Sequence, residues 1–380
     1  MIIGILKEPG SEKRVALLPN HIGALKKLNV EVWVENNAGK AAFSQNANYV
    51  AAGALIDSAE NILTKSNLIL VVSKPKDAAL EQIQNNQILV GGLNPLSNKD
   101  MVQKLSAQGV SLFSLDFIPR TTRAQNMDVL SSMATISGYS AVLNAAAYLP
   151  KFFPMFMSAA GTIKPAKVLI LGAGVAGLQS ISVARKLGAV VEVFDVRSAV
   201  KEEVKSLGGK FIEVEGARDE ATAGGYAVEQ TEEFKQKQKQ LIHDHSITSD
   251  VIICTAQIPG KNAPTLLTKE TVMQMKPGSV IVDIAASTGG NCELTRNGET
   301  IIQQEITIIG KSDYPSDMPV DASMMFGNNI INFLKLIIKP NGSLDLNFDD
   351  EIVKGTCITH NGQIVNERYK QLIGLPKEEA

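Results

Sequence analysis

Cysteine and histidine are scarce in this chain, and their spacing excludes the sites that they usually build. The 380 residues contain three cysteines, Cys254, Cys292 and Cys357, which lie far apart and form no C-x-x-C pair. This excludes a disulfide framework and is typical of buried thiols in a reducing compartment. His243 and His245 are two positions apart, so they do not share a face of a helix. We therefore expect a surface pair and no metal site.

Net charge and long apolar runs are also lacking. The formal net charge is −2 at pH 7, which gives no indication of a nucleic-acid partner. The apolar run in the N-terminal MIIGILKEPG is too short for a signal peptide. Residues 129–150 carry no charge, but they include serines, a threonine and an asparagine. A lipid-facing helix is more apolar than this, so the segment predicts a buried helix between two domains.

The stretch Lys167–Asp195 has the pattern of a phosphate-binding turn between a strand and a helix. A short apolar run ends at Leu171 and is followed by Gly172, Gly174 and Gly177 in a G-x-G-x-x-G spacing. The first glycine permits a tight turn, the second lets the backbone approach a pyrophosphate, and the third lets helix and strand pack closely. The pyrophosphate binds the free N–H groups at the helix N-terminus. The three glycines alone are a weak signal. With a strand before them and a helix after them, they predict a dinucleotide site in preference to a glycine-rich turn that binds nothing.

An acidic residue at the end of the next predicted strand, 190–194, completes this pattern. Asp195 lies 18 residues after Gly177, where its carboxylate can accept hydrogen bonds from a ribose 2′-OH. The carboxylate favours NAD over NADP because it would repel a 2′-phosphate, although an arginine at position 197 could bind that phosphate. The predicted cofactor-binding residues here are Gly172, Gly174, Val175, Ala176, Gly177, Asp195, Val196 and Arg197.

A loop after a later strand is predicted to lie at the nicotinamide end of the same site. The segment 255–260 follows the expected strand 251–255, and its Ala256 and Gln257 are further candidate cofactor-binding residues. The segment 284–291 follows the next expected strand, 279–284, in the same way.

Strand and helix patterns alternate along the chain, which predicts an α/β fold. The length favours two domains. In the first half the expected strands are 2–6, 30–35, 68–72, 88–91 and 111–115, with helices such as 21–28, 46–52 and 99–108 between them. We expect two doubly wound parallel-sheet, Rossmann-like domains with a cleft between them: residues 1–131 completed by 320–380, and an NAD-binding domain of residues 132–319. Residues 352–356 and 364–365 predict a short terminal hairpin.

Two polar segments of the N-terminal domain have more than one interpretation. Lys7, Glu8 and Arg14 follow the first strand, at an edge where such sheets bind ligands, but from the sequence alone a solvated charged turn is the better explanation. The segment 119–132 precedes the long helix and contains Arg120, Arg123, Gln125 and Asp128. A loop at a domain junction is a favoured ligand site. Capping of the helix by Asp128 or Asn126 is an equally good explanation.

Several specific motifs occur together in this chain. They are, in order, GILKEP, EKRVALLP, PRTTRAQNMDVLSSMATISGY, KPAKVLILGAGVAGLQSI, LGAVVEVFDVR, AGGYA, TAQIPGKNAPTLLT, MKPGSVIVDIA and GGNCE. Together they resemble the NAD(H)-binding component, domain I, of proton-translocating nicotinamide nucleotide transhydrogenase, over nearly the whole chain. Alanine dehydrogenase is a related family that shares the first signature and the Rossmann half.

The resemblance implies a peripheral NAD(H)-binding subunit, cytoplasmic and attached to the inner membrane through its partners. It would form a homodimer and dock with an NADP(H)-binding subunit and a membrane-spanning subunit, which carries the proton channel because this chain contains no membrane segment. Hydride would pass directly from NADH to NADP⁺, coupled to inward proton movement. By the match to one of the family's loops, the resemblance implies that the dihydronicotinamide is held by Arg120, Gln125, Asp128 and Ser131, with Gln125 facing the partner nucleotide. By the match to another, it implies that Gly225 and Tyr226 lie in a mobile loop that closes over the nucleotide.

The chemistry of hydride transfer agrees with this inventory of residues. Transfer between two nicotinamides needs orientation and exclusion of water, but no general acid or base. Oxidation of an amino acid needs a proton acceptor, usually histidine. By resemblance, alanine dehydrogenases carry their catalytic histidine at the place of residues 91–95. These residues of this chain read Gly-Gly-Leu-Asn-Pro, so that histidine is missing.

Two alternatives remain open beside the transhydrogenase interpretation. Arg14 and Lys74 match the substrate-binding positions of alanine dehydrogenase, which keeps an amino-acid dehydrogenase in consideration. A non-catalytic NAD-sensing module is the other, but it would have no need of the Arg120–Asp128 loop. One departure concerns Gln257, where transhydrogenases commonly have leucine, so packing at the nicotinamide is expected to differ there.

Overall fold

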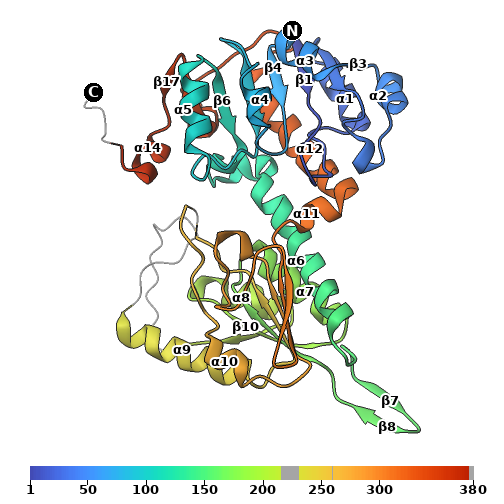
Figure 1. Ribbon diagram of the computed structural model, residues 1–380, viewed down its shortest axis with the longest axis vertical. Coiled ribbons are helices and arrows are strands. Elements are labelled where there is room, and N and C mark those ends of the chain that lie inside the picture. Colours follow the sequence, from blue (N-terminus) through green and yellow to red (C-terminus); the bar gives the residue numbers. More distant parts are fainter. Residues whose placement is uncertain (215–230, 259, 376–380) are drawn as a thin grey trace. The chain divides into compact units, whose positions relative to one another are not determined.

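The structure is a computed structural model that describes residues 1–214, 231–258 and 260–375. The chain divides into two compact units (Figure 1). Unit 1 contains Met1–Met133 and Pro315–Ala380, and unit 2 contains Ala134–Tyr314. Both are α/β units built on a mainly parallel sheet, as the alternating strand and helix patterns predicted.

The sheet of unit 1 has eight strands in the order β17-β16-β6-β5-β4-β1-β2-β3. Its strands are β1 (Ile2–Ile5), β2 (Glu31–Glu35), β3 (Leu55–Asp57), β4 (Leu68–Leu70), β5 (Ile88–Gly91), β6 (Ser111–Ser114), β16 (Cys357–His360) and β17 (Gln363–Ile364). Strands β1 to β6 pair in parallel, and β16 adds antiparallel to β6. Strands β16 and β17 pair antiparallel and form a terminal hairpin, as predicted, but the predicted boundaries were wrong. Residues 351–356 form helix α13, because Asp350 caps this segment by accepting hydrogen bonds from Ile352 and Val353.

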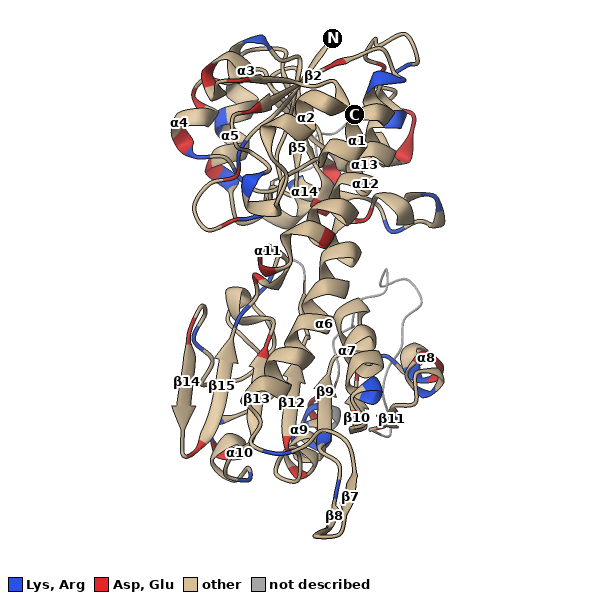
Figure 2. Ribbon diagram, turned by 90° about the vertical axis from the view of Figure 1, so that its right-hand side faces the viewer, with Lys and Arg blue, Asp and Glu red and all other residues tan. Residues whose placement is uncertain are grey.

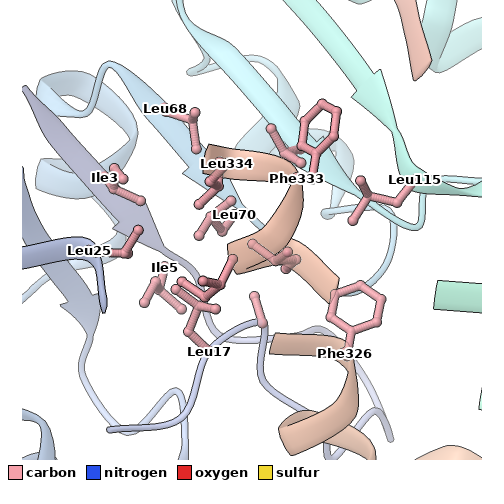
Figure 3. Packing of buried hydrophobic residues seen from close by; sticks show 14 of the residues in the cluster. Ile3, Ile5, Leu17, Leu25, Leu68, Leu70, Leu115, Phe326, Phe333 and Leu334 are labelled. Atoms are coloured by element: carbon pink, nitrogen blue, oxygen red, sulfur yellow. The ribbon is translucent and has the colours of Figure 1, made fainter. Parts of the chain in front are cut away.

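The helices of unit 1 come from both ends of the chain. They are α1 (Pro19–Lys26), α2 (Asn46–Ala52), α3 (Ala59–Lys65), α4 (Asp77–Leu80), α5 (Lys99–Ala107), α12 (Pro319–Ile337), α13 (Glu351–Thr356) and α14 (Glu367–Ile373), with 3₁₀ turns η1 (Lys40–Ala42), η2 (Leu115–Phe117) and η3 (Thr122–Met127). Helix α12 places Phe326, Phe333 and Leu334 in one buried cluster with Leu70 of β4 and Leu115 of η2 (Figure 3). The C-terminal segment thus completes the core of the N-terminal unit.

The sheet of unit 2 has seven strands in the order β11-β10-β9-β12-β13-β15-β14, which lie side by side in Figure 2. They are β9 (Lys167–Leu171), β10 (Val190–Phe194), β11 (Lys210–Ile212), β12 (Val251–Cys254), β13 (Val280–Asp283), β14 (Thr300–Gln303) and β15 (Ile306–Gly310). Among the described strands of this sheet, the edge strand β14 alone is antiparallel to its neighbour. The helices are α7 (Val175–Lys186), α8 (Lys201–Ser206), α9 (Glu232–Ser246) and α10 (Lys269–Met273), and η4 (Ser198–Val200) and η5 (Ala286–Thr288) are short 3₁₀ turns. A separate hairpin of β7 (Phe156–Ser158) and β8 (Gly161–Ile163) projects from this unit (Figure 1).

Helix α6 (Val129–Tyr148) begins in unit 1 and continues into unit 2, and the short helix α11 (Tyr314–Asp317) marks the return of the chain. The prediction that α6 is buried is wrong in part, because Tyr139, Leu143 and Tyr148 are exposed. The segment has no charged residue to mark an outer face, so packing alone decides which side is covered. No helix in the described residues combines the length and the apolar character needed to cross a bilayer.

Candidate functional site

Strands β9 and β12 border the point in unit 2 where the order of the sheet reverses. From β9 the chain proceeds to β10 on one side, and β12 lies on the other side, with Ile170 paired to Val193 and to Ile253. In such sheets ligands bind in the crevice outside the carboxyl ends of the strands at this point. The loops after β9 and β12 are therefore the candidate ligand site of unit 2.

The glycine turn after β9 is required by close contacts. Gly172 has a φ of 105°, and a Cβ there would lie 2.6 Å from Thr255 Oγ1. A Cβ on Gly177 would lie 1.9 Å from the carbonyl oxygen of Gly172. At Gly174 a Cβ would meet nothing within 4 Å. The first and third glycines are needed by the fold itself, whereas the second lies at an open position that a phosphate group fits.

Helix α7 starts at this open position. Gly174 is its N-terminal cap, Val175 and Gly174 are exposed, and Ala176 is half-buried. The first N–H groups of a helix have no partner within the helix and carry its positive dipole end. This arrangement suits the pyrophosphate of a dinucleotide, as the spacing of the glycines predicted.

Asp195 follows β10 and is tied to the glycine turn. Its carboxylate accepts the Ala173 N–H at 2.7 Å and the Arg197 N–H at 2.9 Å. The Arg197 guanidinium donates to both carboxylate oxygens, from Nε at 2.9 Å and from Nη2 at 2.7 Å. Sequence reasoning placed both residues at the ribose but missed this ion pair, because the two side chains meet only through the fold of the turn. A ribose hydroxyl that binds Asp195 must compete with the guanidinium.

The loop after β12 lies next to the glycine turn. The Thr255 hydroxyl donates to the carbonyl of Gly172 at 2.9 Å, Ala256 is half-buried and Gln257 is exposed. Thr255 was not among the predicted site residues, although its hydroxyl joins the two loops. Val196 is half-buried in the same region. Gly225 and Tyr226 lie outside the described residues.

The Arg120–Asp128 loop belongs to unit 1 and is held from several sides. Asp128 accepts the Ser131 N–H at 3.0 Å and the Ser131 hydroxyl at 2.6 Å, so it does cap the first turn of α6. Arg123 forms a two-point ion pair with Asp350, with Nη1–Oδ2 and Nη2–Oδ1 distances of 2.8 and 2.6 Å. The side chains of Arg120 and Gln125 are exposed.

The carbonyl of Asn126 is the third anchor of this loop. It accepts hydrogen bonds from Asn329 Nδ2 at 2.9 Å and from Asn332 Nδ2 at 3.1 Å, both on α12. The loop thus has a fixed backbone, with Gln125 exposed beside the anchored Asn126.

A second polar cluster lies at the carboxyl edge of the sheet in unit 1. Glu8 is buried and accepts hydrogen bonds from Val72 N at 2.6 Å and from the N and Oγ of Ser73 at 3.0 and 2.7 Å. Burial raises the pKa of Glu8 to about 7, against the lowering effect of these hydrogen bonds. Arg14 is paired with Glu12, with an Nη2–Oε2 distance of 2.6 Å. The alternative of a solvated charged turn is therefore wrong for Glu8 and Arg14, although it holds for the exposed Lys7.

The four histidines have structural partners in the fold. His21 Nδ1 accepts the Leu18 N–H at 3.0 Å, His360 contacts the Ser111 hydroxyl at 2.8 Å, and His243 contacts Thr271 at 3.0 Å. His245 bonds Glu192 at 2.6 Å. Burial would raise the pKa of Glu192, but hydrogen bonds from His245, Lys167 and Lys210 bring it to about 2. Over the described ranges, no three metal-ligating side chains gather into a possible metal site.

Fold and site together define a two-unit α/β protein with a dinucleotide-binding turn in its second unit. Residues 4–137 match the family described as alanine dehydrogenase/PNT, N-terminal domain, and residues 141–367 match its C-terminal domain. The chain belongs to this alanine dehydrogenase/PNT family.

Individual relatives place the chain nearer to transhydrogenases than to alanine dehydrogenases. It is 43% identical to the first part of NAD(P) transhydrogenase subunit alpha of Rhodospirillum rubrum, over 96% of this chain and 98% of that protein. It is 25% identical to alanine dehydrogenase of Mycolicibacterium smegmatis, over 100% and 99% of the two chains. A solved transhydrogenase structure from Sinorhizobium meliloti matches with a TM-score of 0.88 and 38% identity, over 96% of this chain and 100% of that one. The transhydrogenase resemblance inferred from the motifs is confirmed.

Proposed function

We propose that this chain is the NAD(H)-binding subunit of a proton-translocating NAD(P) transhydrogenase. In this function it holds NADH while hydride passes to NADP⁺ on a partner subunit. The observation that carries the proposal is the glycine turn of unit 2 with Asp195 bonded to it, which is the arrangement that binds a dinucleotide with an unmodified ribose. The similarity to transhydrogenase alpha subunits along the whole chain supports the choice of reaction.

A bound dihydronicotinamide supplies the hydride, and the residues of this chain supply position. The Gly174–Ala176 turn holds the pyrophosphate, and Asp195 holds the adenosine ribose. Hydride leaves with both electrons of its C–H bond, so no side chain has to accept or donate a proton. A requirement for orientation and for exclusion of water remains. The partners of the four histidines, described above, are consistent with a reaction that needs no imidazole base.

The Arg120–Asp128 loop is proposed to orient the dihydronicotinamide toward the partner nucleotide. Gln125 presents its amide to solvent on an anchored loop, which suits a side chain that faces a second nucleotide. Asp128 and Ser131 are bonded to each other, so they act as a unit that fixes the start of α6. Arg120 lies exposed at the beginning of the same loop.

The proposed partners are an NADP(H)-binding subunit, a membrane-spanning subunit and a second copy of this chain. The first two follow from the proposed reaction, and they would attach the chain to the cytoplasmic side of the inner membrane. Support for the homodimer comes from the β7–β8 hairpin, whose six strand residues are all exposed. Phe156 stacks on Phe152 with ring centroids 5.2 Å apart, and both residues are about half exposed, as is Ile163, whereas Met155 and Met157 are more exposed. An isolated two-stranded hairpin is marginally stable in water, so an apolar hairpin of this kind needs a covering surface.

Sedimentation of the purified chain tests the homodimer. Wild type should sediment as a dimer, and Met157→Glu should dissociate it. Ile302→Glu is the matched control, because Ile302 on β14 is 73% exposed and Met157 is 71% exposed. A dimer that survives Met157→Glu would overturn the role given to the hairpin.

Nucleotide titration and a direct activity assay test the reaction class. The chain should bind NADH more tightly than NADPH, and NADPH binding that is equal or tighter would overturn the assignment. An alanine-dehydrogenase-like enzyme is the second candidate, favoured by Arg14 and Lys74 at the carboxyl edge of the sheet in unit 1. We expect no turnover of L-alanine with NAD, and a rate of about 1 s⁻¹ or more would favour the dehydrogenase.

A further inference from the structure

One buried amide joins the loop after β12 to the loop after β13. The side chain of Asn291 is fully buried, and its Nδ2 donates to the carbonyls of Ala256 at 2.9 Å and Pro264 at 2.8 Å. Its Oδ1 accepts the Ala256 N–H at 3.0 Å. Both polar groups of the Ala256 backbone are therefore bonded to the same side chain.

Asp283, the last residue of β13, holds Asn291 in place. Its buried carboxylate accepts the Asn291 N–H at 2.7 Å, the Cys292 N–H at 3.0 Å and the Thr295 hydroxyl at 2.7 Å. The turn before Asn291 requires glycine, because Gly290 has a φ of 81° and a Cβ there would lie 2.8 Å from Asp283 Oδ2. Asp283, Gly290 and Asn291 thus form one rigid support under the Ala256 loop.

The supported loop lies at the reversal point of the sheet. Ala256 follows β12, the neighbour of β9, and the Thr255 hydroxyl binds the first glycine of the phosphate turn. A dinucleotide whose pyrophosphate is at that turn extends its nicotinamide toward the loop after β12. The position of Ala256 and Gln257 therefore affects the nicotinamide half of the ligand and not the adenosine half.

We propose that Asn291, supported by Asp283, is a positioning residue that fixes Ala256 and Gln257 for contact with the nicotinamide half of the bound dinucleotide. This inference rests on the proposed function, since it requires that unit 2 binds NAD(H). Asparagine suits the role because one amide offers two donors and an acceptor in a single plane. Alanine would leave the polar groups of Ala256 without this partner and release the loop.

The test compares two ligands on the purified full-length chain. NADH contains the nicotinamide, whereas ADP-ribose shares only the adenosine, the pyrophosphate and the second ribose. In Asn291→Ala we expect NADH to bind about tenfold or more weakly, as for loss of a buried hydrogen bond with its partner left unsatisfied. ADP-ribose should bind with a change of less than about threefold, because its contacts lie at the glycine turn and Asp195.

Thr295→Val is the matched control. It removes one hydrogen bond to Asp283 and leaves the amide contacts of Asn291 with Ala256 intact. We expect a lower melting temperature with an unchanged ratio of NADH to ADP-ribose affinity. If Asn291→Ala does not fold, Asn291→Ser provides the same comparison, since a serine hydroxyl is too short to bond both groups of Ala256.

The outcomes separate this inference from the proposed function. An unchanged affinity ratio in the Asn291 variants, or an equal change in Thr295→Val, would overturn the positioning role. Wild-type protein that binds ADP-ribose as tightly as NADH would also overturn it. Wild-type protein that binds neither ligand would overturn the proposed function itself.

Discussion

Replacing Asp195 by asparagine should change which nucleotide the chain prefers. In the wild type, the Asp195 carboxylate accepts two backbone N–H groups and two guanidinium bonds from Arg197. Asparagine has nearly the same shape and keeps one oxygen to accept the Ala173 N–H. The change therefore removes the charge and leaves the glycine turn formed.

The size of the effect follows from two terms. A 2′-phosphate carries a charge of about −1.5 to −2, and two unit charges about 4 Å apart near a protein surface interact by about 4 kcal/mol. Solvent and salt reduce this, and half of it is about 2 kcal/mol. On the NADH side, exchange of a charged acceptor for a neutral one weakens the ribose bond by about 1 kcal/mol. The sum of about 3 kcal/mol corresponds to a loss of NADH preference of about 100-fold.

Arg197 determines how much of the lost NADH preference comes from tighter NADPH binding. Once Asp195 is neutral, the guanidinium can bind the 2′-phosphate in place of the carboxylate. The double variant Asp195→Asn with Arg197→Ala should therefore bind NADPH about tenfold more weakly than the single variant.

Fluorescence titration with NADH and NADPH measures all of these affinities, with a thermal melt to show that each variant is folded. A change in the NADH to NADPH affinity ratio of less than about tenfold in Asp195→Asn would refute the assignment of Asp195 to the ribose. An unchanged NADPH affinity in the double variant would refute the role of Arg197.

Three further predictions concern other parts of the chain. Gln125→Asn should leave NADH affinity unchanged but slow hydride transfer to an NADP analogue bound to a complementary NADP-binding subunit. A displacement of the amide by about 1 Å should slow the transfer about 100-fold, as measured by stopped flow. A wild-type rate would remove Gln125 from the transfer site. Gly174→Ala should keep the melting temperature of the wild type and weaken NADH binding. Gly177→Ala should destabilise the fold by about 1–3 kcal/mol, because the new Cβ meets the Gly172 carbonyl. Equal melting temperatures of the two variants would contradict the structural role of Gly177. The pKa of Glu8 is about 7 in the fold and 4.5 as its ordinary value, so its stabilising effect is complete below about pH 4.5 and is lost as the pH rises through 7. Chemical denaturation at about pH 5 and about pH 8 should show a decrease of roughly 3 kcal/mol that is absent in Glu8→Gln, and parallel pH dependences would exclude Glu8 as the cause.

The sequence predicted most strands of the two sheets and the nucleotide turn because both depend on local pattern, but the short edge strands β3, β11 and β14 were missed. Short apolar runs such as 88–91 became the strand β5 with the same bounds, since a buried parallel strand needs only continuous apolar residues. The spacing of Gly172, Gly174 and Gly177 reflects backbone geometry over six residues, and the close approach of Thr255 to Gly172 adds a requirement from a distant loop. The motifs also identified the family, which the comparison with known proteins confirmed.

Pairings between distant residues were decided only by the tertiary structure. The sequence predicts that Asp195 lies at the ribose, but the bond of its carboxylate to the Ala173 N–H depends on how β9 and β10 pair. Arg123 and Asp350 are 227 positions apart and meet because α13 packs beside the loop in unit 1. The exposure of Tyr139, Leu143 and Tyr148 on α6 could not be predicted from a segment that has no charge to mark its outer side.

The division between what the sequence predicts and what the tertiary structure decides has a physical reason. Strand, helix and turn preferences arise from steric and solvation effects within a few residues, so a single sequence contains them. The support formed by Asp283 and Asn291 joins the end of β13 to the loops after β12 and β13, and in the sequence each of the two reads as an ordinary polar residue. The sequence by itself therefore determined that unit 2 has a nucleotide turn, and the tertiary structure decided which buried groups hold its loops in place.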